Sequence, residues 1–146
     1  ATVRVLSQGL LDLGLLKREA VGGVDDVIAQ RHYFRFYMHR TGHWLGMDVH
    51  DCGSYVEPGE IGAVSERRDP LSGETIKDRP SRVLRPGMAL TIEPGLYVRP
   101  AADVPEAFWN LGIRIEDDAI VTATGCELIT RDVPVEPDAI EALMRG

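Results

Sequence analysis

Apolar residues recur every three or four positions at the start of the chain, as they do on one face of an amphipathic helix. The stripe consists of Val3, Leu6, Leu10, Leu13 and Leu16. This spacing predicts a helix of about four turns. After the glycine pair at 22–23, the segment 24–30 begins with acidic residues, which favour a helix start. We therefore expect a short second helix there.

The second half of the chain has the pattern of strands and loops. Residues 53–87 are rich in proline, glycine and charge, which favours loops around short strands. The segment 88–98 is strand-like but is interrupted by Pro94-Gly95, and 110–124 forms a second strand region. We interpret Asp117-Asp118, which breaks the second region, as charges at a turn.

A last helix is expected near the end of the chain. Pro137 can occupy its first turn, where a missing N–H group costs nothing. Ile140, Leu143 and Met144 then give this helix one apolar side. Helices at both ends with several strands between them predict an α+β fold.

Composition narrows the class of protein. The chain has 146 residues, 16 Lys and Arg, 23 Asp and Glu, a net charge of −7 and 44% hydrophobic residues. These values fit one globular domain with its own core. The acidic balance argues against a nucleic-acid partner, and no apolar run approaches the roughly 18 residues of a membrane span. The start lacks the pattern of a signal peptide, and the two cysteines fit reduced thiols of a cytoplasmic protein.

Histidines are concentrated in one short stretch. All but one of the four histidines lie between His39 and His50, together with glycines and a tryptophan. On a helix, His39 and His43 would share a face, as zinc-binding pairs do, but Gly42 and Gly46 disfavour a helix. We expect a looped path in which each histidine has its own role. The alternative is a packed turn in which the histidines only bind backbone groups.

Glu93 lies in the otherwise apolar segment 90–97. An unpaired carboxylate is costly in such a segment, so it must lie at a strand end, be paired, or bind a metal ion. Pro94-Gly95 marks a strand end or bulge, which can direct a side chain into a cleft. Pairing with a nearby arginine is the alternative, and this segment alone does not decide between them.

Charged residues alternate with isoleucines in the segment 112–118. Arg114 and Glu116 are expected on one side of a strand, and Ile113 and Ile115 on the other. An arginine near a carboxylate keeps it ionised, as a metal ligand must be. The alternative is a charged strand edge that faces solvent.

One histidine and two glutamates from these separate segments form a donor set for a hard metal ion. Oxygen-rich ligands with a single imidazole suit manganese, iron or cobalt better than a structural zinc ion. An ion in such a site activates water and polarises carbonyl groups, which is the chemistry of a hydrolase.

Several ordered motifs also carry a resemblance to a known family. They are MH at 38–39, GHWLGMDVHD at 42–51, LRPGM at 84–88, TIEPGLY at 91–97 and GIRIEDD at 112–118. The chain resembles, over nearly its whole length, the C-terminal part of an Xaa-Pro aminopeptidase (aminopeptidase P) of the pita-bread metallopeptidases.

The resemblance implies a fold and a domain organisation. The fold would be the C-terminal half of a pita-bread domain, with a curved antiparallel sheet and helices on its convex side. Residues 1–146 would be the C-terminal portion of the catalytic domain, without the upstream half and the N-terminal domain. Two aspartate metal ligands of the family lie in that upstream half, and Asp12, Asp25 and Asp26 do not match them. We therefore expect this chain to be inactive alone.

The resemblance also implies metal ligands. The family binds two divalent metal ions, usually Mn²⁺. His43, Glu93 and Glu116 match its histidine and glutamate ligands, with Glu116 at the position that bridges both ions. Both sites need the upstream aspartates in addition.

Further roles follow from the same resemblance. His39 and His50 match histidines that contact the substrate and help to stabilise the transition state. Tyr97 falls near the substrate pocket, and Arg114 matches an arginine beside the metal ligands. Glu93 is expected to shuttle a proton as well as to bind metal.

The implied reaction is removal of the N-terminal residue from peptides with proline in the second position. The expected partners are such peptides and the remainder of the catalytic domain, in a cytoplasmic homo-oligomer without nucleic acid or membrane. Prolidase, which acts on Xaa-Pro dipeptides, is an alternative, although Trp44 and the excursion at 104–106 favour aminopeptidase P. A non-catalytic pita-bread binding module is a second alternative, but every ligand expected in this region is present.

Overall fold

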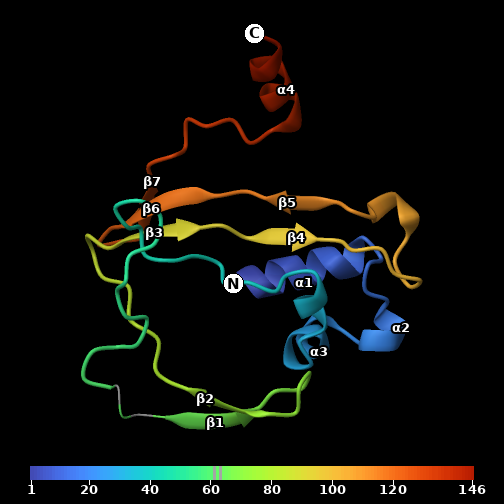
Figure 1. Ribbon diagram of the computed structural model, residues 1–146, viewed down its shortest axis with the longest axis horizontal. Helices are drawn as coiled ribbons and strands as arrows, with labels where there is room; N and C mark the ends of the chain where they lie inside the picture. Colours follow the sequence, from blue (N-terminus) through green and yellow to red (C-terminus); the bar gives the residue numbers. More distant parts are fainter. Residues whose placement is uncertain (61, 63) are drawn as a thin grey trace. The chain divides into compact units, whose positions relative to one another are not determined.

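The computed structural model describes residues 1–60, 62 and 64–146, which form two compact units (Figure 1). Unit 1 consists of Ala1–Arg40, Ser54–Val83 and Gly95–Arg114. Unit 2 consists of Thr41–Gly53, Leu84–Pro94 and Ile115–Gly146. Each unit is therefore built from segments that are far apart in the sequence.

Unit 1 contains short helices and two antiparallel strand pairs. Its helical elements are α1 (Thr2–Asp12), α2 (Arg18–Val21), α3 (Val24–Ala29), η1 (His32–Arg35) and η2 (Glu106–Phe108). Strand β1 (Ser65–Arg68) pairs with β2 (Thr75–Asp78), and β4 (Gly95–Tyr97) pairs with β5 (Gly112–Arg114). The predicted helix at 24–30 and the short strands within 53–87 are thus confirmed.

The hydrophobic core of unit 1 lies against α1. Its buried members are Leu10, Leu11, Leu15, Leu16, Val27, Phe36, Val98 and Val104. The predicted first helix is confirmed, but its predicted length is wrong because it ends at Asp12. Gly14 has a φ angle of 70°, in the left-handed region that favours glycine, so the chain leaves the helix axis there. Leu13 is consequently exposed, while Leu16 reaches the core from the following turn.

Two ion pairs join segments of unit 1 that are distant in the sequence. Arg31 Nη1 lies 2.6 Å from Asp69 Oδ1, and Arg35 Nη1 lies 2.6 Å from Asp103 Oδ2. The hydrogen bond from Arg31 lowers the pKa of Asp69, and the one from Arg35 lowers the pKa of Asp103. Both carboxylates therefore stay ionised to more acidic pH than usual.

Unit 2 contains a three-stranded antiparallel sheet and a terminal helix. The strands β3 (Ala89–Ile92), β6 (Asp117–Val121) and β7 (Cys126–Leu128) lie in the order β3-β6-β7 (Figure 1). Helix α4 (Pro137–Arg145) has its proline in the first turn, as predicted. Its apolar residues are exposed, and none of its residues is buried.

The two predicted strand regions, 88–98 and 110–124, are confirmed, and their strands pair antiparallel. Strand β3 pairs with β6, whereas β5 pairs with β4. The prediction that Asp117-Asp118 forms a turn is wrong, since both residues lie in β6, where they pair with Ile92 and Thr91 of β3. The Thr130 hydroxyl provides both aspartates with a partner: it donates to Asp117 Oδ1 over 2.7 Å and accepts the N–H of Asp118 over 3.0 Å.

No helix in the described part of the chain is long and apolar enough to cross a membrane. Cys52 and Cys126 are both exposed free cysteines.

Candidate metal centre

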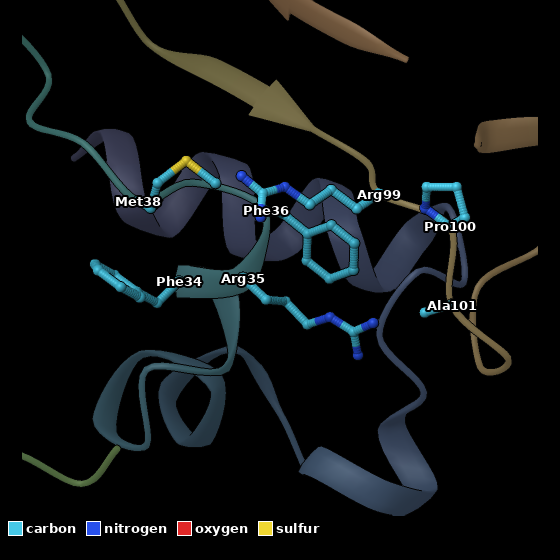
Figure 2. Close-up of a pocket in the computed structure, with 7 residues that line it drawn as sticks. All are labelled: Phe34, Arg35, Phe36, Met38, Arg99, Pro100 and Ala101. Carbon is cyan, nitrogen blue, oxygen red and sulfur yellow. The ribbon is translucent and has the colours of Figure 1, made fainter. Parts of the chain in front are cut away.

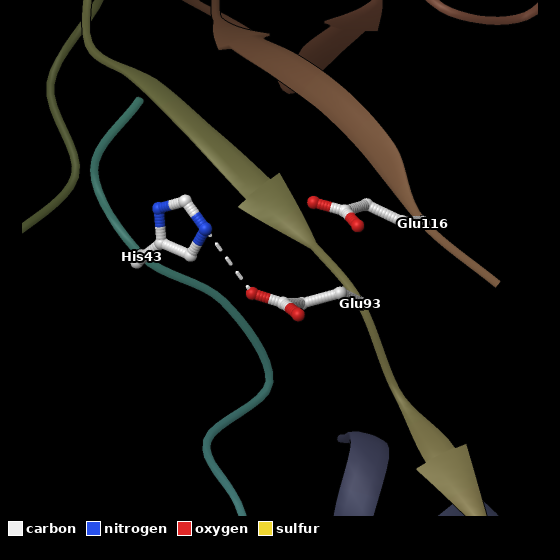
Figure 3. A group of neighbouring side chains, drawn as sticks. All are labelled: His43, Glu93 and Glu116. Carbon is white, nitrogen blue, oxygen red and sulfur yellow. Dashed lines mark ion pairs between the residues drawn. The ribbon is translucent and has the colours of Figure 1, made fainter. Parts of the chain in front are cut away.

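Three possible metal ligands converge in unit 2. His43, Glu93 and Glu116 each offer one ligand atom, and these atoms all lie within 4.8 Å of one another. His43 comes from the segment beside β3, Glu93 directly follows β3, and Glu116 directly precedes β6 (Figure 3). Glu93 is only 9% exposed, whereas Glu116 is exposed. The side chains identified from three distant motifs therefore lie together.

Main-chain hydrogen bonds place His43 next to Glu93. The N–H of Thr91 donates to the carbonyl of His43 over 2.9 Å, and the N–H of Glu93 donates to the carbonyl of Thr41 over 2.7 Å. A Cβ atom on Gly42 would overlap the carbonyl oxygen of Thr91, so the close approach of the two segments requires glycine here. The segment carrying His43 thus behaves as a further strand along β3.

The His43 ring presents one nitrogen toward Glu93. Its Nδ1 lies 3.0 Å from the carbonyl oxygen of Trp44, which can only accept, so Nδ1 carries the proton. In the neutral ring Nε2 then holds a lone pair, and it lies 3.3 Å from Glu93 Oε1. At this distance Nε2 can either give its lone pair to a metal ion or carry a second proton that pairs with the Glu93 carboxylate.

A divalent metal ion fits this donor set. Metal-binding histidines usually donate their other ring N–H to a carbonyl or carboxylate, as His43 does to Trp44. A single imidazole with two carboxylates suits a hard or borderline ion such as Mn²⁺, Fe²⁺ or Zn²⁺. The residues present are therefore compatible with a metal site, to which His43, Glu93 and Glu116 would each contribute a ligand.

His50 lies beside His43. The centroids of the two rings are 4.1 Å apart in an edge-to-face arrangement. A tight turn causes this proximity, because the N–H of Gly46 donates to the carbonyl of Val49 over 3.0 Å. A Cβ atom on Gly46 would overlap the main chain at His50. The glycine thus lets the chain return and bring the second histidine to the cluster.

Thr91 also belongs to the cluster, although the sequence analysis assigned it no role. Its hydroxyl accepts the N–H of His43 over 3.0 Å and donates to Glu93 Oε1 over 3.1 Å. The side chain is only 2% exposed. Two-residue alternation along a strand places Thr91 and Glu93 on one face, which is the signal that could have identified this residue.

The other predicted site residues lie in unit 1. The Nδ1–H of His39 donates to the carbonyl of Arg40 over 2.7 Å, and its Nε2 accepts the hydroxyl proton of Tyr97 over 3.1 Å. Arg114 lies opposite Gly95 in the β4–β5 pair. A Cβ atom on Gly95 would lie 2.7 Å from the Tyr97 hydroxyl oxygen and 3.2 Å from Arg114 Cβ. His39 and Tyr97 therefore contact each other, with Arg114 on the neighbouring strand.

Unit 1 also contains a cavity of about 450 Å³, whose lining residues are labelled in Figure 2. Phe34, Phe36 and Met38 supply apolar walls, and the charged residues Arg35 and Arg99 also line the cavity. Arg35 is paired with a carboxylate outside the lining. The lining includes no imidazole, carboxylate, thiol or hydroxyl group, so it offers no acid–base or nucleophilic chemistry.

Comparison with known proteins identifies the family. Residues 18–123 match the model of metallopeptidase family M24. The chain belongs to this metallopeptidase family.

Curated relatives extend the match to nearly the whole chain. The Xaa-Pro aminopeptidase of Escherichia coli K12 is 46% identical over 142 residues, which cover 97% of this chain and 26% of that protein. The Xaa-Pro aminopeptidase of Haemophilus influenzae is 42% identical over 142 residues, or 97% of this chain and 27% of that protein. The chain thus spans about a quarter of the length of these relatives.

Solved structures have the same fold. Pseudomonas aeruginosa aminopeptidase PepP matches with a TM-score of 0.75 and 46% identity, over 98% of this chain and 27% of that one. Escherichia coli aminopeptidase P with the inhibitor Pro-Leu gives a TM-score of 0.72 and 45% identity, with the same coverage. The zinc-substituted Escherichia coli enzyme in complex with product gives a TM-score of 0.73 and 45% identity, again over 98% of this chain and 27% of that one. The predicted α+β fold of the pita-bread type is confirmed.

Proposed function

We propose that this chain is the C-terminal portion of the catalytic domain of a metal-dependent Xaa-Pro aminopeptidase. Such an enzyme removes the N-terminal residue from peptides with proline in the second position. The observation that carries the proposal is the convergence of His43, Glu93 and Glu116 within 4.8 Å, in a chain whose relatives are named Xaa-Pro aminopeptidases. Because the chain covers about a quarter of those relatives, the remainder of the domain is a required partner.

The proposed cofactor is a pair of divalent metal ions, with Mn²⁺ as the preferred ion. His43, Glu93 and Glu116 would be ligands, Glu116 would bridge the ions, and two upstream aspartates would complete the set. When bound, the ions activate a water molecule and polarise the scissile carbonyl group. The inward-facing Nε2 of His43 and the zinc-substituted form of the Escherichia coli relative support this proposal.

Two residues near the ligands are proposed to take part in the reaction. His50, whose ring contacts His43, is suited to donate a hydrogen bond to the substrate oxygen that gains negative charge. Glu93 is suited to accept a proton from the attacking water and to pass it to the leaving nitrogen, because its carboxylate is buried beside His43.

His39, Tyr97 and Arg114 are proposed to bind the peptide, and His39 and Arg114 also to assist the reaction, on the strength of the family resemblance. The hydrogen bond from Tyr97 to His39 supports a fixed orientation for both side chains. A cytoplasmic homo-oligomer is the proposed form of the intact enzyme.

Peptide hydrolysis by the full-length protein tests the proposal. We expect cleavage of an Xaa-Pro-Xaa tripeptide in the presence of Mn²⁺, and loss of cleavage after treatment with a chelator. Cleavage of Xaa-Pro dipeptides alone would identify a prolidase instead. Metal binding without cleavage of either peptide would identify a binding module.

The isolated 146-residue chain provides a second test. It should not cleave the tripeptide with Mn²⁺ added, because it lacks the two aspartates that would complete the ligand set. Turnover by this chain would contradict the proposed ligand set.

A further inference from the structure

We propose that Thr91 is a positioning residue that orients both His43 and Glu93 toward the metal site through one hydroxyl group. The inference rests on the proposed function, because it concerns the ligands of the proposed metal centre. Thr91 itself is not a metal ligand in this account. It acts on the ion only through the two residues that it holds.

The direction of each hydrogen bond follows from the chemistry of the groups. The backbone N–H of His43 can only donate, so the Thr91 oxygen accepts this bond, which spans 3.0 Å. The hydroxyl then has one proton left, and Glu93 Oε1 receives it over 3.1 Å. One hydroxyl therefore links the backbone of one proposed ligand to the carboxylate of another.

The carboxylate oxygen that Thr91 contacts is the one that faces the imidazole. Glu93 Oε1 accepts from Thr91 and also lies 3.3 Å from His43 Nε2. Rotation of the carboxylate would break the bond to Thr91 and move this oxygen away from Nε2. The bond thus selects the orientation in which two proposed ligand atoms face each other before a metal ion arrives.

The surroundings of Thr91 make this arrangement rigid. The side chain is 2% exposed, so no bulk water replaces a lost partner. A β-branched residue in a strand has restricted rotation about χ1, which fixes the direction of the hydroxyl. The Thr91 N–H also bonds to the carbonyl of His43, so two contacts hold the same residue.

Thr130 offers a matched control within unit 2. Its hydroxyl also accepts one backbone N–H, that of Asp118, and donates to one carboxylate, that of Asp117. Neither aspartate is a proposed metal ligand. The substitution Thr130→Val therefore removes the same two kinds of hydrogen bond without touching a ligand.

The experiment measures the affinity of the full-length, substrate-free protein for Mn²⁺ by calorimetry. We expect Thr91→Val to weaken binding by about 10- to 100-fold, as loss of a ligand-orienting partner typically does. Thr91→Ser, which retains the hydroxyl, should stay within about threefold of wild type, and so should Thr130→Val. Wild-type affinity in Thr91→Val, or an equal loss in Thr130→Val, would overturn the inference.

Two further comparisons keep the outcome decisive. If Thr91→Val does not fold, Thr91→Ala and Thr91→Ser replace it, because both lack the methyl group and differ only in the hydroxyl. Equal Mn²⁺ affinity in these two variants would contradict the inference. A wild-type protein that binds no Mn²⁺ would instead contradict the proposed function, so the two failures are distinguishable.

Discussion

His43 and His39 have the same local geometry but different surroundings. Each ring donates its Nδ1–H to the carbonyl of the next residue, over 3.0 Å to Trp44 and over 2.7 Å to Arg40. Each ring therefore presents Nε2 to its neighbours. His43 lies in unit 2, and His39 lies in unit 1.

The group that faces Nε2 differs between the two histidines. His43 faces the carboxylate of Glu93, which can only accept, so Nε2 there takes either a proton or a metal ion. His39 faces the hydroxyl of Tyr97, which donates and satisfies the ring nitrogen without an ion. The comparison teaches that the neighbour of the second nitrogen, and not the local main chain, distinguishes an imidazole suited to a metal ion from one that is already satisfied.

The largest expected effect comes from Glu116, the third member of the His43 cluster. In the full-length protein, Glu116→Ala should remove both metal ions, and excess Mn²⁺ should not restore activity. Loss of several kcal/mol of metal-derived transition-state stabilisation corresponds to a rate on the order of 1,000-fold lower. Elemental analysis and tripeptide hydrolysis test this, with the exposed Glu127→Ala as control. Two bound ions and a near-native rate in Glu116→Ala would make this residue an ordinary surface charge.

The two histidines themselves provide the next test. His43→Ala should weaken Mn²⁺ affinity by at least about 10- to 100-fold and leave at most one ion bound. His39→Ala should leave Mn²⁺ affinity within about threefold of wild type and change the KM for the tripeptide. His50→Ala should keep both ions and lower kcat. Equal losses of metal affinity in His43→Ala and His39→Ala would break the comparison.

A smaller effect is expected from the main chain that holds His43. Gly42→Ala places a methyl group against the Thr91 carbonyl, which should destabilise unit 2 by about 1–3 kcal/mol and displace His43. Gly9→Ala is the control, because a Cβ atom at this α1 position meets no atom within 4 Å. That change should stabilise the protein by up to about 1 kcal/mol. Denaturant unfolding of both variants measures the difference, and a neutral Gly42→Ala would contradict the close approach.

The smallest effect concerns the acid sensitivity of unit 1, which carries His39. The pKa of Asp69 is lowered from its ordinary value of 3.8 by the hydrogen bond from Arg31. The folded state thus binds this proton less readily than the unfolded state, so the pair stabilises fully above about pH 4. Its contribution is lost as the pH falls through the lowered folded-state pKa.

Thermal unfolding of the metal-free, full-length protein between about pH 5 and pH 3 measures this contribution. Asp69→Asn should lower the midpoint temperature of unfolding near about pH 5. As the pH is reduced toward about 3, this midpoint should fall less in the variant than in the wild type. Asp132→Asn, an exposed control in unit 2, should follow the wild-type curve. Parallel curves for Asp69→Asn and wild type would show that the ion pair does not contribute.

Several features could be predicted from the sequence because they depend on near neighbours in the chain. The apolar stripe around Leu10 indicated α1, and Pro94 marked the end of β3 because it lacks an N–H group. Glu93 and the histidine stretch 39–50 were identified because a carboxylate in an apolar strand, and histidines among glycines, are unusual patterns, whereas the choice of His43 within that stretch came from the family resemblance. These signals need no knowledge of the fold.

Other features depend on contacts between distant segments. The register in which β3 pairs with β6 follows from interactions across the sheet. The role of Thr91 needs the position of His43 beside β3, and the protonated nitrogen of His43 needs the location of the Trp44 carbonyl. A pattern of residue types contains none of these positions.

Anomalous diffraction from crystals of the full-length protein grown with Mn²⁺ tests the central claim most directly. The account predicts a manganese peak at bonding distance from His43 Nε2 and from the carboxylates of Glu93 and Glu116. A map without such a peak, in crystals where the His43–Glu93 contact is intact, would contradict the claim that this cluster is a metal site.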